Sequence, residues 1–246
     1  MLFRSMIRKM KFQKKLGALG ELCERSKRKR ETEMHSNIQP MLTLVPEEMA
    51  SRTPYHLLTS ITAPRPIAWI STINQAGEPN LAGFSFYNAV AGFPPTIMFS
   101  VSYRVTREPR VKDTLRNVQE VGEFVCHVVD EANADAMIKT SIDFHPDINE
   151  FEVAGLTAVP SIDVRPFRVA EAPVAMECRV TQIIPVEGAT NVMVLGRVLR
   201  FHIRQDLYRE NGLVDTIKMK PITRLGGSIE YTKIGELFHL DIPNPD

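Results

Sequence analysis

Residues 64–88, PRPIAWISTINQAGEPNLAGFSFYN, are the stretch that decides the fold. An apolar run from Ile67 to Ile73 follows two prolines, and a polar turn from Asn74 to Pro79 follows the run. The chain then returns from Leu81 to Phe86 through small, hydroxyl-bearing and aromatic residues. Two such runs around a Gly- and Pro-containing loop predict a pair of strands joined as a hairpin.

The first of these strands is apolar on both faces. Ile67, Trp69 and Ile73 lie on one face, and Ala68 and Ile70 lie on the other. A strand of this kind needs cover on both sides. We expect the interior of a barrel to cover one face, and a helix or a partner subunit to cover the other.

Further strands are expected at 96–102, 123–129, 174–184 and 191–204, and short helices at 112–118 and 130–140. In 174–184 the residues expected to point inward are Val174, Met176, Cys178 and Val180, and those expected to point outward are Ala175, Glu177, Arg179 and Thr181. In 191–204 the expected apolar face is Met193, Leu195, Leu199, Phe201 and Ile203, and Gly196 predicts a bulge. The connection 141–170 is long and irregular, which is often a sign of function. Strands outnumber helices without a βαβ rhythm, so the chain is predicted to be mainly β, an antiparallel barrel with short helices.

Charge is distributed unevenly along the 246 residues. Residues 1–40 carry 11 Lys and Arg against 4 Asp and Glu, whereas the rest carries 19 against 25. The mildly acidic body lacks the basic footprint of a nucleic-acid-binding domain. We expect residues 1–40 to be a disordered basic extension and 41–246 to be the working domain. A transit peptide is the alternative for the extension, and it would place the protein in mitochondria.

Several kinds of chemistry lack their sequence signals. There is no GxGxxG or GxxxxGK[ST] motif for a classical dinucleotide or ATP site, and no GxSxG nucleophile elbow. There is also no HExxH motif and the six histidines stand singly, so no metal site is predicted. Three cysteines without a CxxC pair indicate a reducing compartment, and we expect a cytoplasmic protein. No apolar run has the length of a membrane span.

One third of the chain concentrates groups that can bind phosphate or a planar ring. Hydroxyls and cations that can donate to phosphate occur at Ser71, Thr72, Ser100, Ser102, Arg104, Arg107, Lys112 and Thr114. The segment 80–88 is rich in small residues, and its Gly83 permits close approach of a ligand to the backbone. An ordinary core hairpin with surface cations is the competing interpretation.

The chain resembles the flavin reductase-like family, which has the FMN-binding split-barrel (Greek-key) fold. The matching motifs occur in order between residues 41 and 235: PRPIAWIST (64–72), NLAGFSFYN (80–88), PPTIMFSVS (94–102), KDTLRN (112–117), FEVAGL (151–156), APVAMECRV (172–180) and RLGGSIEY (224–231). The resemblance implies a homodimer with one flavin per subunit near the interface.

Carried over to this chain, the resemblance implies two groups of cofactor-binding residues. The isoalloxazine would be lined by Ser71, Thr72, Asn80, Ala82, Gly83, Ser85, Phe86 and Asn88. The phosphate would be held by Ser100, Ser102, Arg104, Lys112 and Thr114, with Asp113 ordering the loop, and Arg224 and Tyr231 would close the site. Arg107 and Arg110 compete with Arg104 for the phosphate, and Gly83 stands where many relatives carry proline.

The function implied is that of an FMN-binding oxidoreductase, with FAD as the alternative ligand. NAD(P)H would reduce the flavin, and the electrons would pass to a monooxygenase or another acceptor. No side chain is expected to be catalytic, because the cofactor carries the chemistry. His127, His145 and His202 are candidates for contacting the nicotinamide or the flavin edge. The alternatives are a flavoredoxin-like electron carrier that does not use NAD(P)H directly, and a non-catalytic flavin-binding protein.

Overall fold

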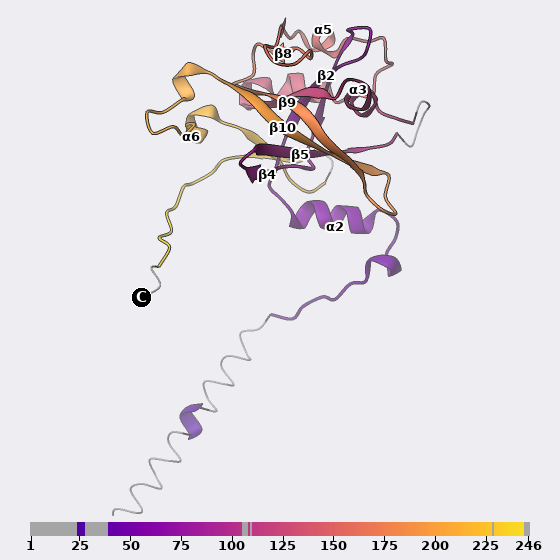
Figure 1. Ribbon diagram of the computed structural model, residues 1–246. Coiled ribbons are helices and arrows are strands. Elements are labelled where there is room, and N and C mark those ends of the chain that lie inside the picture. The colour runs from indigo at the N-terminus through magenta and orange to yellow at the C-terminus, as the bar shows by residue number, and fades with distance from the viewer. Residues whose placement is uncertain (1–23, 28–38, 105–107, 109, 228, 244–246) are drawn as a thin grey trace, which may run out of the picture. The chain divides into compact units, whose positions relative to one another are not determined.

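A computed structural model describes residues 24–27, 39–104, 108, 110–227 and 229–243 (Figure 1). The chain divides into two units, Met1–Ser51 and Arg52–Asp246. The first unit holds the 3-10 helix η1 (Pro46–Glu48). Most of the expected basic extension, together with Cys23 and Arg107, lies outside the described residues, and the boundary near residue 40 stays a prediction.

The second unit, which we call the body, is built around a seven-stranded antiparallel sheet. Across the sheet the order is β3 (Pro79–Phe84), β2 (Ala68–Ile73), β6 (Glu123–Val128), β9 (Val174–Pro185), β10 (Asn191–Ile203), β5 (Pro95–Ser102) and β4 (Tyr87–Gly92). The predicted hairpin is β2 with β3, with Ser71 opposite Leu81 and Thr72 opposite Asn80.

The two edge strands of this sheet show that it is a split barrel. β3 and β4 are at opposite edges, yet only Ser85 and Phe86 join them. A link of two residues spans no more than about 10 Å, so the sheet must curl until its edges approach one another. Phe86 O accepts a hydrogen bond from Ser100 N on β5 at 2.9 Å, which holds the link against the barrel wall. The predicted fold class is confirmed.

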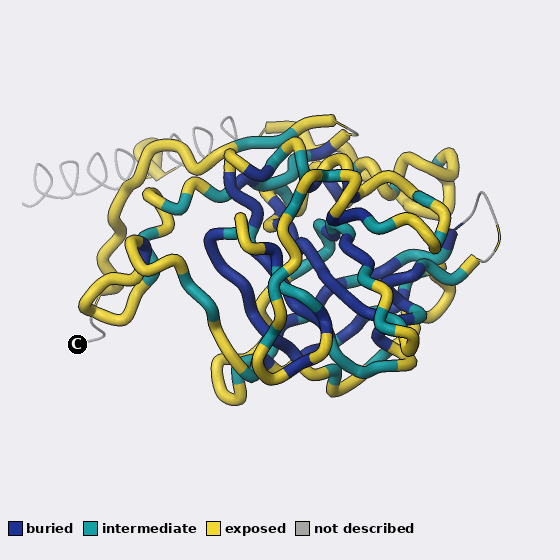
Figure 2. Tube along the Cα trace, turned by 90° about the horizontal axis from the view of Figure 1, so that it is seen from above, coloured by how far each residue is buried: buried dark blue, intermediate teal, exposed yellow. Residues whose placement is uncertain are grey.

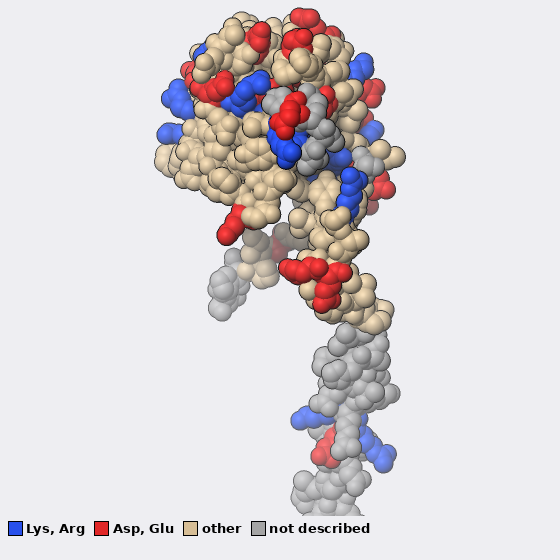
Figure 3. All heavy atoms as spheres, turned by 90° about the vertical axis from the view of Figure 1, so that its right-hand side faces the viewer, with Lys and Arg blue, Asp and Glu red and all other residues tan. Residues whose placement is uncertain are grey.

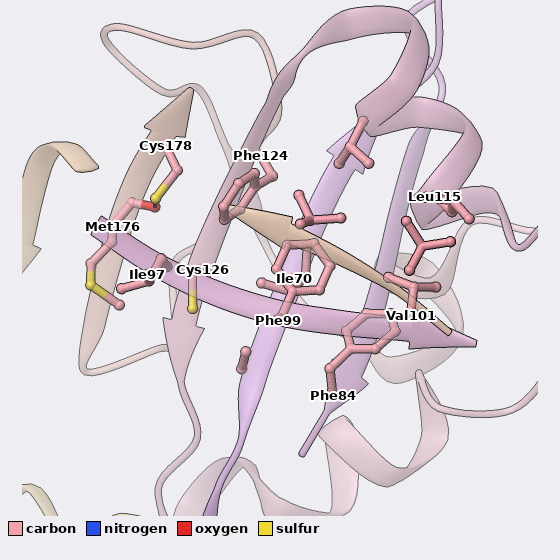
Figure 4. Close-up of a cluster of buried hydrophobic side chains, with 14 of the residues drawn as sticks. Ile70, Phe84, Ile97, Phe99, Val101, Leu115, Phe124, Cys126, Met176 and Cys178 are labelled. Atoms are coloured by element: carbon pink, nitrogen blue, oxygen red, sulfur yellow. Dashed lines mark hydrogen bonds between the residues drawn. The ribbon is translucent and has the colours of Figure 1, made fainter. Parts of the chain in front are cut away.

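The barrel interior is filled by apolar side chains from facing strands. Phe84, Phe99 and Phe124 lie in a row, with ring centroids 5.3 and 5.1 Å apart in a tilted and an edge-to-face contact. Figure 4 shows these rings pointing toward one another among side chains of β2, β6 and β9, with Leu115 entering from α3 (Asp113–Val121). Cys126 and Cys178 are free thiols in this core, and burial raises the pKa of Cys126 to about 12. They are packing residues, as expected for Cys178.

Gly196 makes room for the Phe124 ring. A Cβ at this position would lie 2.3 Å from the ring carbon Cζ of Phe124. The pairing of β9 with β10 shifts register between Leu195 and Gly196, so the predicted bulge is confirmed.

The apolar face expected for β10 is wrong. The buried side chains are Val192, Val194 and Val198, whereas Met193 and Leu195 are half-buried and Phe201 is 53% exposed. Both alternate sets of residues in this strand are apolar, so the sequence pattern does not show which set faces inward.

The outer face of β2 is covered by the same chain. Trp69 packs with Met137 of α4 (Ala134–Lys139) and Phe151 of α5 (Glu150–Ala154), and its indole Nε1 donates to Thr140 Oγ1 at 2.9 Å. The helix expected at 130–140 is confirmed as the 3-10 helix η2 (Glu131–Asn133) followed by α4, and the side chain of Asp130 caps its start. The second face of β2 was expected to be covered by a helix or by a partner subunit, and helices of the same chain cover it.

Ala175 and Glu177 on β9 are buried, although both were expected to point outward. The Glu177 carboxylate accepts from Ile162 N at 2.8 Å, from Asp163 N at 2.6 Å and from His202 Nε2 at 2.6 Å. Burial acts to raise the pKa of Glu177, but these three donors outweigh it and lower the pKa. The carboxylate therefore anchors part of the long connection 141–170 to the barrel, a role that strand alternation cannot predict.

The remaining elements surround the barrel. They are α2 (Thr53–Ile61), the 3-10 helix η3 (Gln205–Leu207), α6 (Thr216–Met219), a sheet of β1 (Arg65–Pro66), β11 (Ile222–Arg224) and β12 (Tyr231–Lys233), and a pair of β7 (Ala158–Val159) and β8 (Arg168–Val169). Figure 2 shows the buried segments gathered in the middle of the body and the exposed segments around them.

Candidate functional site

A polar pocket of about 70 Å³ lies beside β3, an edge strand of the barrel. It is lined by residues that the sequence pointed to, namely Asn80, Ala82, Gly83, Arg104, Lys112, Asp113 and Thr114. The opposite wall is the segment Thr140–Phe144 together with Glu150. The pocket has room for a group the size of phosphate, and it is smaller than the roughly 300–1,000 Å³ of sites that enclose a whole small molecule.

The edge of β3 that is not paired with β2 turns backbone donors toward this pocket. Leu81 N donates to Glu150 Oε2 at 3.2 Å, so Leu81 does not bond to β2 through its N–H. Hydrogen bonding alternates along an antiparallel strand, so the N–H of Gly83 points to the same side as that of Leu81. Met137 and Ser141 lie within about 3 Å of where a Cβ of residue 83 would be, which explains a glycine at this close approach.

Arg104 is buried and is held by several acceptors. Its guanidinium pairs with Asp113, with Asp143 Oδ1 at 2.7 Å and with the carbonyl of Val111 at 2.6 Å. Burial acts to lower the pKa of Arg104, but the two carboxylates outweigh it and raise the pKa. Arg104 therefore ties the start of α3 to the pocket wall, and its charge is matched by carboxylates.

Lys112 is the cation of the pocket that remains available. Its side chain is half-buried, and among the described residues no hydrogen bond or ion pair of its ammonium is found. Burial lowers the pKa of Lys112, while Asp143 opposes and Arg104 reinforces that effect. A partly desolvated ammonium without a fixed partner is suited to binding an anion. Arg110, the competing cation, is exposed and pairs with Glu108 at 2.9 Å.

Glu150 is a pocket residue that the sequence interpretation missed. It is 8% exposed, and burial raises the pKa of its carboxyl to about 7. Its position in the long connection 141–170, directly before the FEVAGL motif, is the feature of the sequence that could have pointed to it. Asp143 belongs to the same connection and was missed for the same reason.

Beneath the pocket, a buried polar network fixes α3 to the hairpin. Thr72 Oγ1 accepts from Asn80 Nδ2 and from Asn117 Nδ2, both at 3.1 Å, and Asn80 Nδ2 also donates to Thr114 Oγ1 at 3.0 Å. Thr72 therefore supports the site from beneath, while Asn80 and Thr114 belong to this network and also line the pocket. Ser71 is fully buried, and its Oγ has no hydrogen-bond partner in the described part of the chain.

The other predicted ring and phosphate residues lie on the β4–β5 side of the split. Ser100 Oγ accepts from Asn191 Nδ2 at 3.1 Å, and Ser102 lies opposite Asn191 in the strand pairing. Phe86 contacts Tyr55 of α2 with ring centroids 6.3 Å apart, and the side chain of Asn88 is exposed. With Ser85 in the link, these residues form a second group that does not line the pocket.

Arg224 and Tyr231 form a pair in the small sheet. The guanidinium of Arg224 lies 5.6 Å from the centroid of the Tyr231 ring. Tyr231 lines a different pocket, of about 320 Å³, beside α4. The structure therefore does not bring these two residues to the Lys112 pocket.

The three candidate histidines have different environments. His127 is fully buried between Trp69 O and Val169 N, with contacts of 2.9 and 3.0 Å, and burial lowers its pKa to about 4. His202 is bonded to Glu177, and His145 is exposed and pairs with Asp147. None of the three lines the Lys112 pocket.

Charge on the face of the body seen in Figure 3 is mixed. Basic and acidic side chains are interspersed there without a continuous basic surface. Within the described residues, no group of three or more His, Cys, Asp or Glu side chains is arranged to hold a metal ion. No described helix is long and apolar enough to cross a membrane.

The fold and the pocket together define a class of protein, a split antiparallel barrel with a polar pocket of mixed charge beside an edge strand. The sequence model of the flavin reductase like domain matches residues 61–222. A protein of Halalkalibacterium halodurans, described only as uncharacterized, is 42% identical over 206 residues, which are 82% of this chain and 97% of that protein. The chain therefore belongs to the flavin reductase-like family, and the predicted resemblance is confirmed.

Two solved structures extend the comparison. Nitrilotriacetate monooxygenase component B from Bacillus cereus is 37% identical, with a TM-score of 0.78, and the match covers 82% of this chain and all of that one. The 2-nitrobenzoate 2-nitroreductase of Pseudomonas fluorescens is 30% identical, with a TM-score of 0.73, and the match covers 82% of this chain and 96% of that one.

Proposed function

We propose that this protein is an FMN-binding oxidoreductase that uses NADH or NADPH as its electron donor and passes electrons to a partner. The observation that carries the proposal is the uncommitted ammonium of Lys112 in a phosphate-sized pocket of a flavin reductase-like chain. The similarity to component B of a monooxygenase supports delivery of reducing equivalents to a second protein.

The donor set fits a flavin mononucleotide in two parts. The ammonium of Lys112 and the N–H of Gly83 suit a terminal phosphate, because both are donors at the pocket. The ring would lie outside the pocket, toward Ser85, Phe86 and Asn88, since the pocket is too small to enclose it. A pocket of this size favours the terminal phosphate of FMN over the pyrophosphate of FAD, which must continue to an adenosine.

The side chains of the site bind and orient rather than react. A bound flavin would supply the two-electron chemistry that none of these side chains can supply. Arg104 would act as a positioning residue by fixing the start of α3 and the segment around Asp143, and the Thr72–Asn80–Asn117 network would fix the hairpin. No general base is required of the chain.

We also propose a homodimer. α2 exposes Tyr55, Leu58 and Ile61 at intervals of three residues, and Phe93 after β4 is 96% exposed. Apolar stripes of this kind usually mark an interaction surface. Light scattering that gives twice the chain mass would support the dimer, and the mass of one chain would contradict it.

The test of the oxidoreductase proposal is an anaerobic titration of the FMN-loaded protein. We expect NADH or NADPH to bleach the flavin absorbance. Bleaching by dithionite alone would instead favour an electron carrier that does not use NAD(P)H directly. Failure to retain FMN after gel filtration would contradict the reductase, the electron carrier and the non-catalytic flavin-binding protein alike.

A further inference from the structure

Glu150 is the least expected group in the pocket, because a carboxylate there would oppose binding of an anion. It is held in place by its Oε2, which accepts from Leu81 N on the edge of β3 at 3.2 Å. It lines the Lys112 pocket and also a neighbouring pocket that contains Glu78 and Arg116. Its position between the two pockets makes it part of the wall against which a bound anion would lie.

Among the described residues, the charges around Glu150 balance without it. The described cations that line the two pockets are Arg104, Lys112 and Arg116, and the other described carboxylates are Asp113, Asp143 and Glu78. Arg104 pairs with both Asp113 and Asp143, and Arg116 Nη2 pairs with Asp113 at 2.7 Å. An ionised Glu150 would therefore give the described part of the site a net charge of −1 before any phosphate entered.

We propose that Glu150 binds the phosphate of the cofactor as a neutral carboxylic acid, so that cofactor binding is coupled to retention or uptake of one proton. Since Oε2 is engaged by Leu81 N, Oε1 carries the proton and donates it in a hydrogen bond to a phosphate oxygen. The inference rests on the proposed flavin function, and it adds a binding residue and a pH dependence to that function.

The physical reason for the proton is the cost of placing like charges together in a partly buried site. A phosphate monoester is mostly doubly charged above a pH of about 6. Its repulsion by an ionised carboxylate in a region of low dielectric is much larger than in water. Burial first, and then Asp113, raise the pKa of Glu150 to about 7, so about half of the free protein already carries the neutral acid at pH 7. A bound phosphate would raise that pKa further.

The test is FMN affinity as a function of pH. For the natural protein we expect the dissociation constant to rise about 10- to 30-fold between pH 6.5 and 8.5, because one proton with a pKa of about 7 must stay bound. Glu150→Gln keeps the size of the side chain, an oxygen that accepts from Leu81 N and a neutral donor group. The FMN affinity of this variant should therefore change less than about twofold between pH 6.5 and 8.5. Glu152→Gln, on the same helix but exposed, is the matched control and should behave like the natural protein.

A second readout separates Glu150 from Lys112, whose deprotonation would also weaken binding at high pH. Calorimetry at pH 7.5 in buffers of different ionisation enthalpy should show uptake of most of one proton per FMN in the natural protein and of almost none in Glu150→Gln. An unchanged pH profile and unchanged proton uptake in Glu150→Gln would overturn the proposal while leaving FMN binding intact. Absence of FMN binding at every pH would overturn the proposed function itself.

Discussion

Lys112→Met is the substitution that should weaken FMN binding most selectively. The ammonium of Lys112 is the pocket cation without a carboxylate partner among the described residues, and methionine keeps most of the apolar stem. A hydrogen bond to a charged partner contributes roughly 1.5–3 kcal/mol. Its loss should therefore raise the dissociation constant for FMN about 10- to 150-fold.

The same substitution should not destabilise the free protein. Burial lowers the pKa of Lys112, which means that the surroundings disfavour its charge, so removal of the charge should leave the melting temperature unchanged or slightly higher. The assay is quenching of flavin fluorescence, with riboflavin as the ligand that lacks the phosphate. Riboflavin affinity should be the same in both proteins.

The matched control is Arg110→Met. Arg110 is a neighbouring cation that is exposed and pairs with Glu108 at the surface. We expect its FMN affinity to stay within about twofold of the natural value, since exposed pairs contribute little. Equal losses of FMN and riboflavin affinity in Lys112→Met, or no loss of either, would refute the assignment of Lys112 to the phosphate.

Three further predictions concern other parts of the body. Asp143→Asn removes a carboxylate that faces Arg104, so FMN should bind about three- to tenfold more tightly in equilibrium titrations, and weaker binding would contradict the charge balance around Glu150. Gly196→Ala places a Cβ 2.3 Å from the Phe124 ring, so it should lower the free energy of unfolding by about 1–3 kcal/mol and the melting temperature by several degrees. Gly92→Ala, whose Cβ would meet no atom within 4 Å, is the control and should leave both unchanged. Burial lowers the pKa of His127 to about 4, so between about pH 6.5 and 4 this imidazole is protonated in the unfolded chain but not in the folded one. The free energy of unfolding should therefore fall by up to about 3 kcal/mol as the pH decreases through that window. Urea unfolding of His127→Gln should show a shallower loss over the same range, and an identical slope would remove His127 from the explanation.

The sequence predicted the barrel because its signals are local. The two apolar faces of 67–73, the bulge at Gly196 and the helix start near residue 130 each depend on neighbouring residues, and the structure confirms them. The predictions failed where segments distant in the sequence determine the environment of a residue. Glu177 looked like a solvent-facing residue of β9 until the connection containing Ile162 and Asp163 folded over it.

The candidate site was predicted in part for the same reason. Asn80, Gly83 and Lys112 stand in motifs that mark them by residue type, and the structure brings them to one pocket. Glu150 and Asp143 come from a connection without a periodic pattern, and their roles depend on where that connection lies against β3. The competition of Arg107 and Arg110 with Arg104 could not be settled from spacing, because only the fold shows that two carboxylates already pair with Arg104 and that Arg110 pairs with Glu108 at the surface.

The central claim is that this chain binds a flavin through its phosphate in the Lys112 pocket. The most direct measurement is a comparison of FMN and riboflavin affinity for the natural protein at pH 6.5. We predict that FMN binds with one equivalent per chain and at least about tenfold more tightly than riboflavin, since the phosphate contributes a charge-assisted bond. Equal affinities for the two ligands, or no binding of FMN, would contradict the account.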